Sequence, residues 1–327
     1  MKYFISLAIL LCSLPAFTQQ AGKNLVVVTI DGIRWQELFK GADEKLLFSS
    51  KYIQADSAET MHAYWAATEA ERREKIFPFI WGILVKQGQV YGNRAYDNIV
   101  QLKNPYAYSY PGYNEIFSGF ADTAIKNNDG GANVNEHVLG FISRQPGFKN
   151  KVAAFTNWTK FGDILNPKKG EFFLSYGNLP LPKDLLTKNH TMQVLNDMQP
   201  RLPALWETDR YDALTYAIAK EYMKMKKPRV LYISLGEADE WAHASRYDLY
   251  LDAARKADEM IQDLWQTLQL DPFYKNNTYL LITTDHGRGL EAEWTSHKGI
   301  IAHSNETWFA VYGPGIAPLG EMTTPRK

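Results

Sequence analysis

Three stretches of this sequence share one pattern, a run of apolar and β-branched residues that ends in an acidic residue. The stretches are residues 25–32, 230–239 and 279–287, and their acids are Asp31, Asp239 and Asp285. A continuous apolar run of this kind is typical of a strand buried on both faces, as in parallel α/β sheets. Because ligands of such sheets bind beyond the carboxyl ends of the strands, the pattern predicts that the three acids meet at one edge.

The rest of the chain alternates helical and strand patterns. Helices are predicted over residues 34–39, 57–75, 77–86, 114–119, 211–226 and 247–268, and further strands over residues 89–91, 151–156 and 308–312. This alternation favours an α/β fold, a doubly wound and mainly parallel sheet with helices on both faces. Residues 163–205 lack a clear period, and we expect a small cap or insertion there.

Acids gathered at one sheet edge build up negative charge unless a cation neutralises it. A metal ion is the simplest neutraliser, with His243, His286 and a further histidine completing its coordination. Each acid taken alone has a plainer interpretation, since an Asp also caps the loop or helix that follows it. Asp239 and His243 are four residues apart, and taken alone this spacing favours a hydrogen bond on a helix surface over a shared metal ion.

The first residues have the features of an export signal: Lys2, an apolar stretch over residues 4–14 and a cleavage region near Pro15. We therefore expect a signal peptide over residues 1–19, a domain over residues 20–327, and a periplasmic or secreted protein. The apolar stretch is too short to remain as a membrane span, so none is expected in the mature chain. The single cysteine, Cys12, lies in the signal, which leaves carboxylates and imidazoles as metal ligands.

A net charge of zero without any basic block argues against nucleic acid as a partner. The chain also has nine Trp and nineteen Tyr, which stack on sugars or bases in some proteins and pack the core in most.

Several short motifs, in this order, resemble the alkaline phosphatase superfamily, and most closely its type I phosphodiesterase/nucleotide pyrophosphatase branch. They are Asp31-Gly32, Ser109-x-Pro111, Asp239-x-x-x-His243, Asp285-His286-Gly287 and His297. The resemblance extends from Asp31 to about Gly315. It implies two Zn²⁺ ions, other divalent metals being possible, with Asp31, Asp285 and His286 holding one ion and Asp239, His243 and His297 the other.

The resemblance also implies the last ligand. The family's final histidine lies sixteen or seventeen residues before a Gly-Pro, and His297 is sixteen residues before Gly313, whereas His303 is ten. His297 is therefore chosen, and His303 is left as a substrate contact or surface residue.

For the catalytic residues, Ser109 stands where the family has its nucleophile, and Asn135, with Asn133 second, is the candidate to hold a phosphoryl oxygen. The sequence departs from the branch at Gly112, where an Asn is usual, and at Tyr113.

These expectations describe an exported phosphoester hydrolase that acts on a small-molecule substrate through a covalent phosphoserine. Diesters are favoured over monoesters because residues 106–120 contain no basic residue, while their four tyrosines either contact the second ester group or pack the loop. The alternatives are a phosphomonoesterase, a sulfatase, and a non-catalytic glycan- or ligand-binding protein. A sulfatase is disfavoured because its motif requires an Arg where this chain has Tyr113. The natural substrate and the oligomeric state are not predicted.

Overall fold

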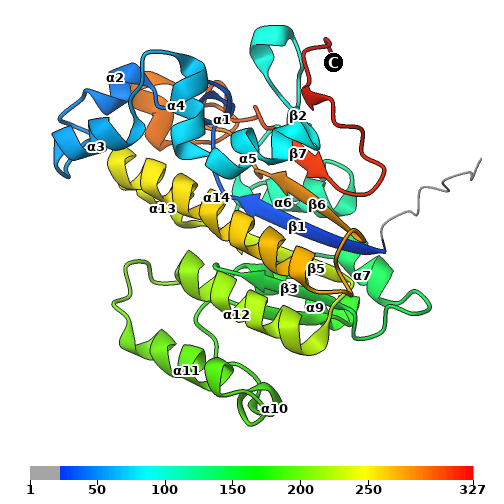
Figure 1. The fold of residues 1–327 in the computed structure, drawn as a ribbon. Helices are drawn as coiled ribbons and strands as arrows, with labels where there is room; N and C mark the ends of the chain where they lie inside the picture. The colour runs from blue at the N-terminus through cyan, green and yellow to red at the C-terminus, as the bar shows by residue number, and fades with distance from the viewer. Residues whose placement is uncertain (1–22, 327) are drawn as a thin grey trace, which may run out of the picture.

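A computed structural model describes residues 23–326 of the chain, so the expected signal peptide lies outside the described residues. Eight strands form one sheet in the order β4-β3-β5-β1-β6-β7-β2-β8 (Figure 1). The strands are β1 (Asn24–Ile30), β2 (Gln89–Tyr91), β3 (Val152–Thr156), β4 (Phe173–Tyr176), β5 (Val230–Leu235), β6 (Thr278–Thr283), β7 (Phe309–Tyr312) and β8 (Gly320–Glu321). Strands β4, β3, β5, β1 and β6 run parallel, whereas β7 is antiparallel to both β6 and β2. The predicted α/β sheet is confirmed.

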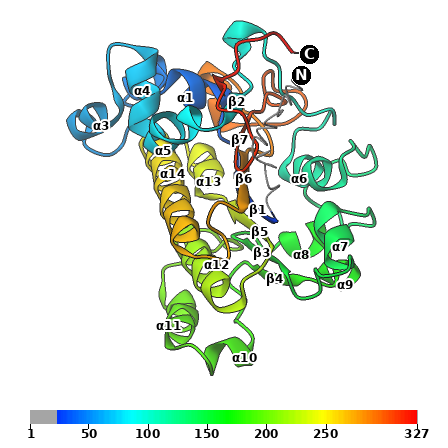
Figure 2. The same cartoon turned by 45° about the vertical axis from the view of Figure 1, so that its right-hand side comes forward.

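Alternation along the central strands divides the apolar core between the two faces of the sheet. On β1, Val26 and Val28 pack into one cluster with the helices α5 (Pro78–Gly82), α12 (Asp212–Lys226) and α14 (Tyr247–Leu270). Val27 packs into a second cluster with α6 (Ser109–Ser118), α7 (Val138–Ser143) and α8 (Phe161–Ile164). Figure 2 shows these two helical layers on either side of the strands. Burial of the strands on both faces explains their continuous apolar sequences.

Shorter elements complete the chain. They are α1 (Trp35–Lys40), α2 (Glu44–Leu47), α3 (Ser57–Tyr64), α4 (Glu69–Ile76), η1 (Leu84–Lys86), η2 (Arg94–Tyr96), α9 (Pro167–Gly170), α10 (Lys183–Leu186), α11 (His190–Met198), η3 (Gln199–Arg201), α13 (Glu237–His243) and η4 (Glu291–Thr295). No helix in the part of the chain that the structure describes is long and apolar enough to span a bilayer.

Some element boundaries differ from the sequence prediction. The helix predicted over residues 57–75 is two helices, because Thr68 forms a capping box with Glu71 and starts α4 anew. Helix α6 begins at Ser109, five residues before the prediction, since Pro111 lies in its first turn, where the missing N–H costs nothing. Residues 163–205 include β4, which pairs with β3 at the sheet edge, and only α10 and α11 project from the sheet (Figure 1).

Asp258 links α14 to α5 across the larger core. Its carboxylate is fully buried and accepts hydrogen bonds from the amides of Phe79 (2.6 Å) and Ile80 (3.1 Å), at the start of a helix whose own N-cap residue offers no side-chain bond. Asp258→Ala should lower the free energy of unfolding by about 2 kcal/mol or more, because two buried N–H groups lose their acceptor. Urea unfolding of the purified domain measures this.

Glu259→Ala is the matched control, because Glu259 is the next carboxylate on α14 and is exposed, paired only with Arg255. It should change the unfolding free energy by less than about 0.5 kcal/mol. Equal losses in the two variants would contradict a capping role for Asp258.

Candidate metal centre and active site

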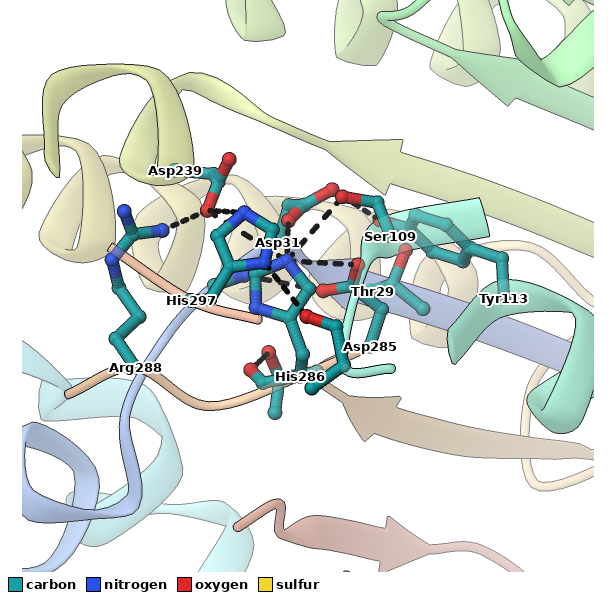
Figure 3. Close-up of polar contacts among 12 residues, drawn as sticks. Thr29, Asp31, Ser109, Tyr113, Asp239, Asp285, His286, Arg288 and His297 are labelled. Carbon is teal, nitrogen blue, oxygen red and sulfur yellow. Dashed lines mark hydrogen bonds and ion pairs between the residues drawn. The ribbon is translucent and has the colours of Figure 1, made fainter. Parts of the chain in front are cut away.

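The predicted metal ligands come together because their three strands are neighbours. Strand β1 lies between β5 and β6 and is parallel to both, with Ile30 opposite Leu235 and Thr29 opposite Thr283. The residues that follow these strands therefore lie together beyond the carboxyl ends of the strands (Figure 3). Helix α13 begins directly after β5 and places Asp239 and His243 one turn apart on one face.

Asp31, Asp285 and His286 form the first group of ligands. The Nε2 atom of His286 lies 3.4 Å from Oδ1 of Asp31 and 3.5 Å from Oδ2 of Asp285. Metal–ligand distances near 2.1 Å and a tetrahedral angle require ligand atoms about 3.4 Å apart, so this spacing fits zinc. Both carboxylate oxygens are buried and have no hydrogen-bond partner among the described residues. Buried oxygens without a partner are costly, and a bound cation would satisfy both.

Asp239, His243 and His297 are the predicted second group, and Asp239 and His297 also come together with His286, whose Nε2 lies 3.8 Å from Oδ1 of Asp239. The Nε2 atom of His243 lies 3.1 Å from Oδ2 of Asp239 and 3.1 Å from Nε2 of His297. The rings of His286 and His297 stack with centroids 3.7 Å apart, so the two groups adjoin. The side chain of His243 is 42% exposed, which places the second group at the open side of the centre.

Backbone carbonyls orient two of the histidines. Nδ1 of His286 lies 2.9 Å from the carbonyl oxygen of Gly287, and Nδ1 of His297 lies 2.8 Å from that of Ala107. A carbonyl only accepts, so each Nδ1 carries the proton and each Nε2 keeps its lone pair for a metal. Ala107 adopts a left-handed φ of 48°, held by two hydrogen bonds that Asn104 Oδ1 accepts from the amides of Tyr106 and Ala107.

The electrostatics of the first group show an excess of negative charge. Burial, followed by the charges of Asp285 and Asp239, raises the pKa of Asp31 well above its ordinary value. Burial and Asp239 likewise raise the pKa of Asp285 to about 8. Burial lowers the pKa of His297 to about 4, which keeps its imidazole neutral at physiological pH. The centre thus combines a neutral imidazole with carboxyl groups that ionise readily only when a cation is nearby. This combination is typical of the donor atoms of a metal site.

Asp239 differs from the other two acids. Burial opposes its ionisation, but the charges of Arg288, His243 and His297 outweigh burial and hold its pKa well below the ordinary value. Arg288 is fully buried and its Nη1 donates to Oδ1 of Asp239 (Figure 3). Arg288 directly follows Asp285-His286-Gly287 in the sequence, and sequence reasoning missed it.

Ser109 is the first residue of α6, and its Oγ lies 3.3 Å from Nε2 of His286. The position of α6 depends on Gly112, where a Cβ would lie 2.4 Å from the carbonyl oxygen of Asp285. This contact gives a physical reason for glycine at a position where the phosphodiesterase branch usually has Asn. A larger residue would push α6, and Ser109 with it, away from the metal ligands.

Tyr113, one turn further along α6, belongs to the centre as well. Its side chain is fully buried and its hydroxyl donates to Oδ2 of Asp31 at 2.9 Å. Tyr110 is also buried and donates to the carbonyl oxygen of Gly131. These two tyrosines pack and position α6, so of the four in this stretch only Tyr106 and Tyr108 retain exposed surface for a substrate.

A cavity of about 130 Å³ opens onto the centre. Ser109 and four of the predicted ligands line it, together with residues that include Asn128, Asp209 and Glu240, and no Lys or Arg is among its lining residues. Larger cavities of about 530 and 720 Å³ lie elsewhere, and no predicted ligand lines them. The chemistry of the side chains therefore identifies the small cavity as the candidate active site.

Two predicted residues lie away from this cavity. The Asn135 amide donates to Asn114 (3.0 Å) and Asp122 (2.7 Å), and neither Asn135 nor the second candidate, Asn133, lines the cavity. Asn128 does, and its Oδ1 accepts a hydrogen bond from the Tyr110 amide at the start of α6. The only sequence signal for Asn128 is its place in the polar turn Asn-Asn-Asp-Gly-Gly that follows α6.

Of the two histidines considered for the last ligand, the structure brings His297 to the centre. His303 instead pairs with Glu306 at 2.9 Å.

Comparisons with known proteins agree with this architecture. Residues 206–318 match the family model described as Metalloenzyme superfamily, and this stretch contains five of the six predicted ligands. The lipoteichoic acid synthase LtaP from Listeria monocytogenes has a similar structure, with a TM-score of 0.55 and 13% identity over 92% of this chain and 68% of that chain. For the phosphonate monoester hydrolase of Agrobacterium radiobacter, the TM-score is 0.53 with 11% identity, over 92% and 70% of the two chains.

A protein in the alkaline phosphatase superfamily from Vibrio parahaemolyticus gives a TM-score of 0.50 and 12% identity, over 92% of this chain and 62% of that chain. No sequence among the curated proteins matches the chain. The chain thus has an α/β fold similar to that of a protein in the alkaline phosphatase superfamily, and its residues 206–318 match the Metalloenzyme superfamily model, as the motif resemblance predicted.

Gly112→Ala should lower the free energy of unfolding by about 1–3 kcal/mol, because the new methyl group would lie 2.4 Å from the backbone oxygen of Asp285 and force the backbone to shift. It should also weaken zinc binding, since Asp285 must shift. Urea unfolding and a zinc titration measure the two effects. Gly82→Ala in α5 is the control, because a Cβ there meets nothing within 4 Å. A Gly112 variant as stable as the control would show that α6 does not depend on this contact.

The metal-free protein should lose stability as pH rises from about 6.5 to about 8. Because the pKa of folded Asp285 is raised to about 8, the folded chain retains a proton that the unfolded chain has already released, and this advantage disappears through that window. Below about pH 6.5 the lowered pKa values of His286 and His297 have the opposite effect, since the unfolded histidines gain protons. Asp285 alone contributes a slope of up to about 1.4 kcal/mol per pH unit, and Asp31, whose pKa is also raised, acts in the same direction.

Chemical unfolding of the chelator-treated protein at a series of pH values measures this slope. Asp285→Asn should make the slope shallower, because the amide does not titrate, while the raised pKa values of Asp31 and Asp258 still contribute. Metal-free wild-type protein that gains stability over the same interval would rule out a raised pKa at Asp285.

Proposed function

We propose that this chain is a metal-dependent phosphoester hydrolase that favours phosphodiesters and forms a covalent phosphoserine at Ser109. One observation carries the proposal. The hydroxyl of Ser109, at the N-terminus of α6, lies 3.3 Å from His286 Nε2, beside two buried carboxylate oxygens that have no partner. A hydroxyl next to a site for divalent cations, at a helix end that favours anions, is the arrangement that phosphoryl transfer requires.

The residues present fit two divalent ions, and zinc suits their mixture of imidazole and carboxylate donors. Asp31, Asp285 and His286 would hold one ion, and Asp239, His243 and His297 the other. When bound, these ions would supply Lewis acidity and compensate the charge of the phosphoryl group. The chain itself provides the nucleophile, its alignment on α6 and the positioned carbonyls that fix the histidine tautomers.

In the reaction, Ser109 Oγ would attack the phosphorus, forming an Oγ–P bond while the bond from phosphorus to the leaving alcohol breaks. The hydroxyl proton of Ser109 is released, and the leaving alkoxide takes up a proton. Water then cleaves the phosphoserine, which restores the serine hydroxyl and releases the phosphate product. Two successive displacements give net retention of configuration at phosphorus. Asn128, at the cavity wall beside α6, is the side chain placed to donate to a phosphoryl oxygen.

The charge of the cavity supports the preference for diesters. Its lining includes Asp31, Asp209, Asp239 and Glu240 and contains neither Lys nor Arg. A phosphomonoester dianion carries one more negative charge than a diester, and no lining side chain offsets that charge. The nearest guanidinium, that of Arg288, is buried behind Asp239 and does not line the cavity.

Tyr113 opposes the sulfatase alternative. The arginine that a sulfatase motif requires would stand at this position, but the fully buried tyrosine already contacts Asp31. We also propose that the protein is exported to the periplasm or secreted, and this part of the proposal rests only on the signal-like sequence of residues 1–19. The substrate is proposed to be a small molecule, since the cavity is small and no basic surface suited to nucleic acid is expected from the sequence.

The test compares bis-p-nitrophenyl phosphate with p-nitrophenyl phosphate, using the zinc-loaded mature chain under one condition. The kcat/KM for the diester should be the larger. Ser109→Ala should lower it by at least about a thousandfold while zinc content and folding stay unchanged, because the nucleophile is lost but no ligand is. Ser118→Ala, at the other end of the same helix, is the control and should retain activity.

Each other outcome selects a different function. A larger kcat/KM for the monoester points to a phosphomonoesterase, and turnover of p-nitrophenyl sulfate alone points to a sulfatase. Zinc binding without turnover of any ester identifies a non-catalytic binding protein. An Ser109→Ala variant that remains active removes the phosphoserine from the mechanism.

A further inference from the structure

Arg288 is a fixed positive charge inside the candidate metal centre. Its side chain has no exposed surface, its Nε donates to the carbonyl oxygen of Trp294 (2.8 Å), and its Nη2 donates to that of Thr295 (2.7 Å). Trp294 is itself fully buried between Tyr52, Tyr247 and Tyr250. The guanidinium is thus held by a packed part of the core, and its Nη1 contacts Asp239.

The two ligand groups therefore differ in charge. The first group has two carboxylates, Asp31 and Asp285, and each has a buried oxygen without a partner. The second group has one carboxylate, Asp239, and its Oδ1 is already bound by Arg288. Asp209 and Glu240 also line the cavity, but Asp209 accepts hydrogen bonds from Asn157 and Thr208, and among the described residues Glu240 makes no hydrogen bond to a predicted ligand.

The hydrogen bonds of the histidines also distinguish the two groups, because those of His286 and His297 favour metal binding through Nε2 and that of His243 opposes it. His286 and His297 each point Nδ1 at a backbone carbonyl, which leaves Nε2 free to coordinate. His243 instead has Nη2 of Arg288 at 3.4 Å from its Nδ1. A guanidinium only donates, so in this contact Nδ1 is the acceptor and the proton lies on Nε2, the atom that would bind the metal. Coordination by His243 requires this contact to be given up.

We propose that Arg288 makes the two metal positions unequal. The site of Asp31, Asp285 and His286 binds its cation first and tightly, whereas the site of Asp239, His243 and His297 binds a second cation weakly and exchanges it. Arg288 acts as a positioning residue that sets this difference, through repulsion of the second cation and through its hold on Asp239 and His243. The inference rests on the metal binding of the proposed function and is independent of the reaction catalysed.

Zinc titration of the metal-free mature chain, by equilibrium dialysis with metal analysis and by competition with a chelating dye, tests this inference. Wild-type protein should show two affinity classes separated by at least about tenfold, as a nearby fixed charge implies. Asp31→Asn should abolish the tight class, and His243→Ala should abolish only the weak class. Arg288→Met removes the charge but keeps the length of the side chain, and it should strengthen the weak class by about tenfold or more.

Arg288→Lys is the matched variant, because it keeps the charge and should leave the weak class closer to wild type. Equal affinities in wild-type protein, loss of the tight class in His243→Ala, or weaker binding of the second ion in Arg288→Met would each overturn the inference. If Arg288→Met does not fold, as circular dichroism would show, the wild-type, Asp31→Asn and His243→Ala titrations still decide whether the two positions are unequal, and the neutral polar variant Arg288→Gln then tests the role of Arg288 in the same titration. A phosphodiesterase with two equal sites refutes this inference alone, whereas a chain that binds no zinc refutes the proposed function too.

Discussion

The side-by-side placement of β5, β1 and β6 is the constraint on which the rest of the centre depends. β5 and nearly all of β1 are buried on both faces, and β6 is buried on one face and partly buried on the other. None of them can therefore shift by one residue without moving its apolar side chains to the other layer. The register therefore fixes where Asp31, Asp239 and Asp285 leave the sheet. Apolar packing determines the position of the acids, and the acids in turn create the demand for a cation.

A second layer of contacts holds the loop that follows β6. Arg34 is fully buried, pairs with Glu37, and donates from Nη1 to the carbonyl oxygen of Gly289 at 3.2 Å. Arg288, one residue earlier than Gly289, donates to the carbonyl oxygens of Trp294 and Thr295 further along the same segment. Two buried cations thus tie down a segment that has little regular structure. Such ordering limits the entropy that the chain would otherwise lose when ligands assemble around an ion.

Sequence reasoning predicted the features that depend on local pattern. The three strands followed from their apolar runs, and motif order and spacing pointed to His297, which the structure places beside Asp239 and His286. Strand β4 was not predicted, because an edge strand is only partly buried and its sequence shows a weak alternation. Asn128 and Arg288 were not predicted for another reason. Their roles depend on contacts with residues distant in the chain, such as that between Arg288 and Asp239, and no local pattern indicates these contacts.

The segment from Asn104 to Ser109 connects two functions that are usually considered separately. Asn104 holds Ala107 in a left-handed conformation, the Ala107 carbonyl orients His297, and Ser109 follows two residues later on α6. The short segment 104–109 therefore positions both the proposed nucleophile, Ser109, and the predicted ligand His297. During evolution, an insertion or substitution in this segment would displace both residues at once, so changes in substrate specificity are not expected there. New specificities would more readily arise at other residues that line the cavity, such as Trp158 and Asp209, which come from segments that hold no predicted ligand.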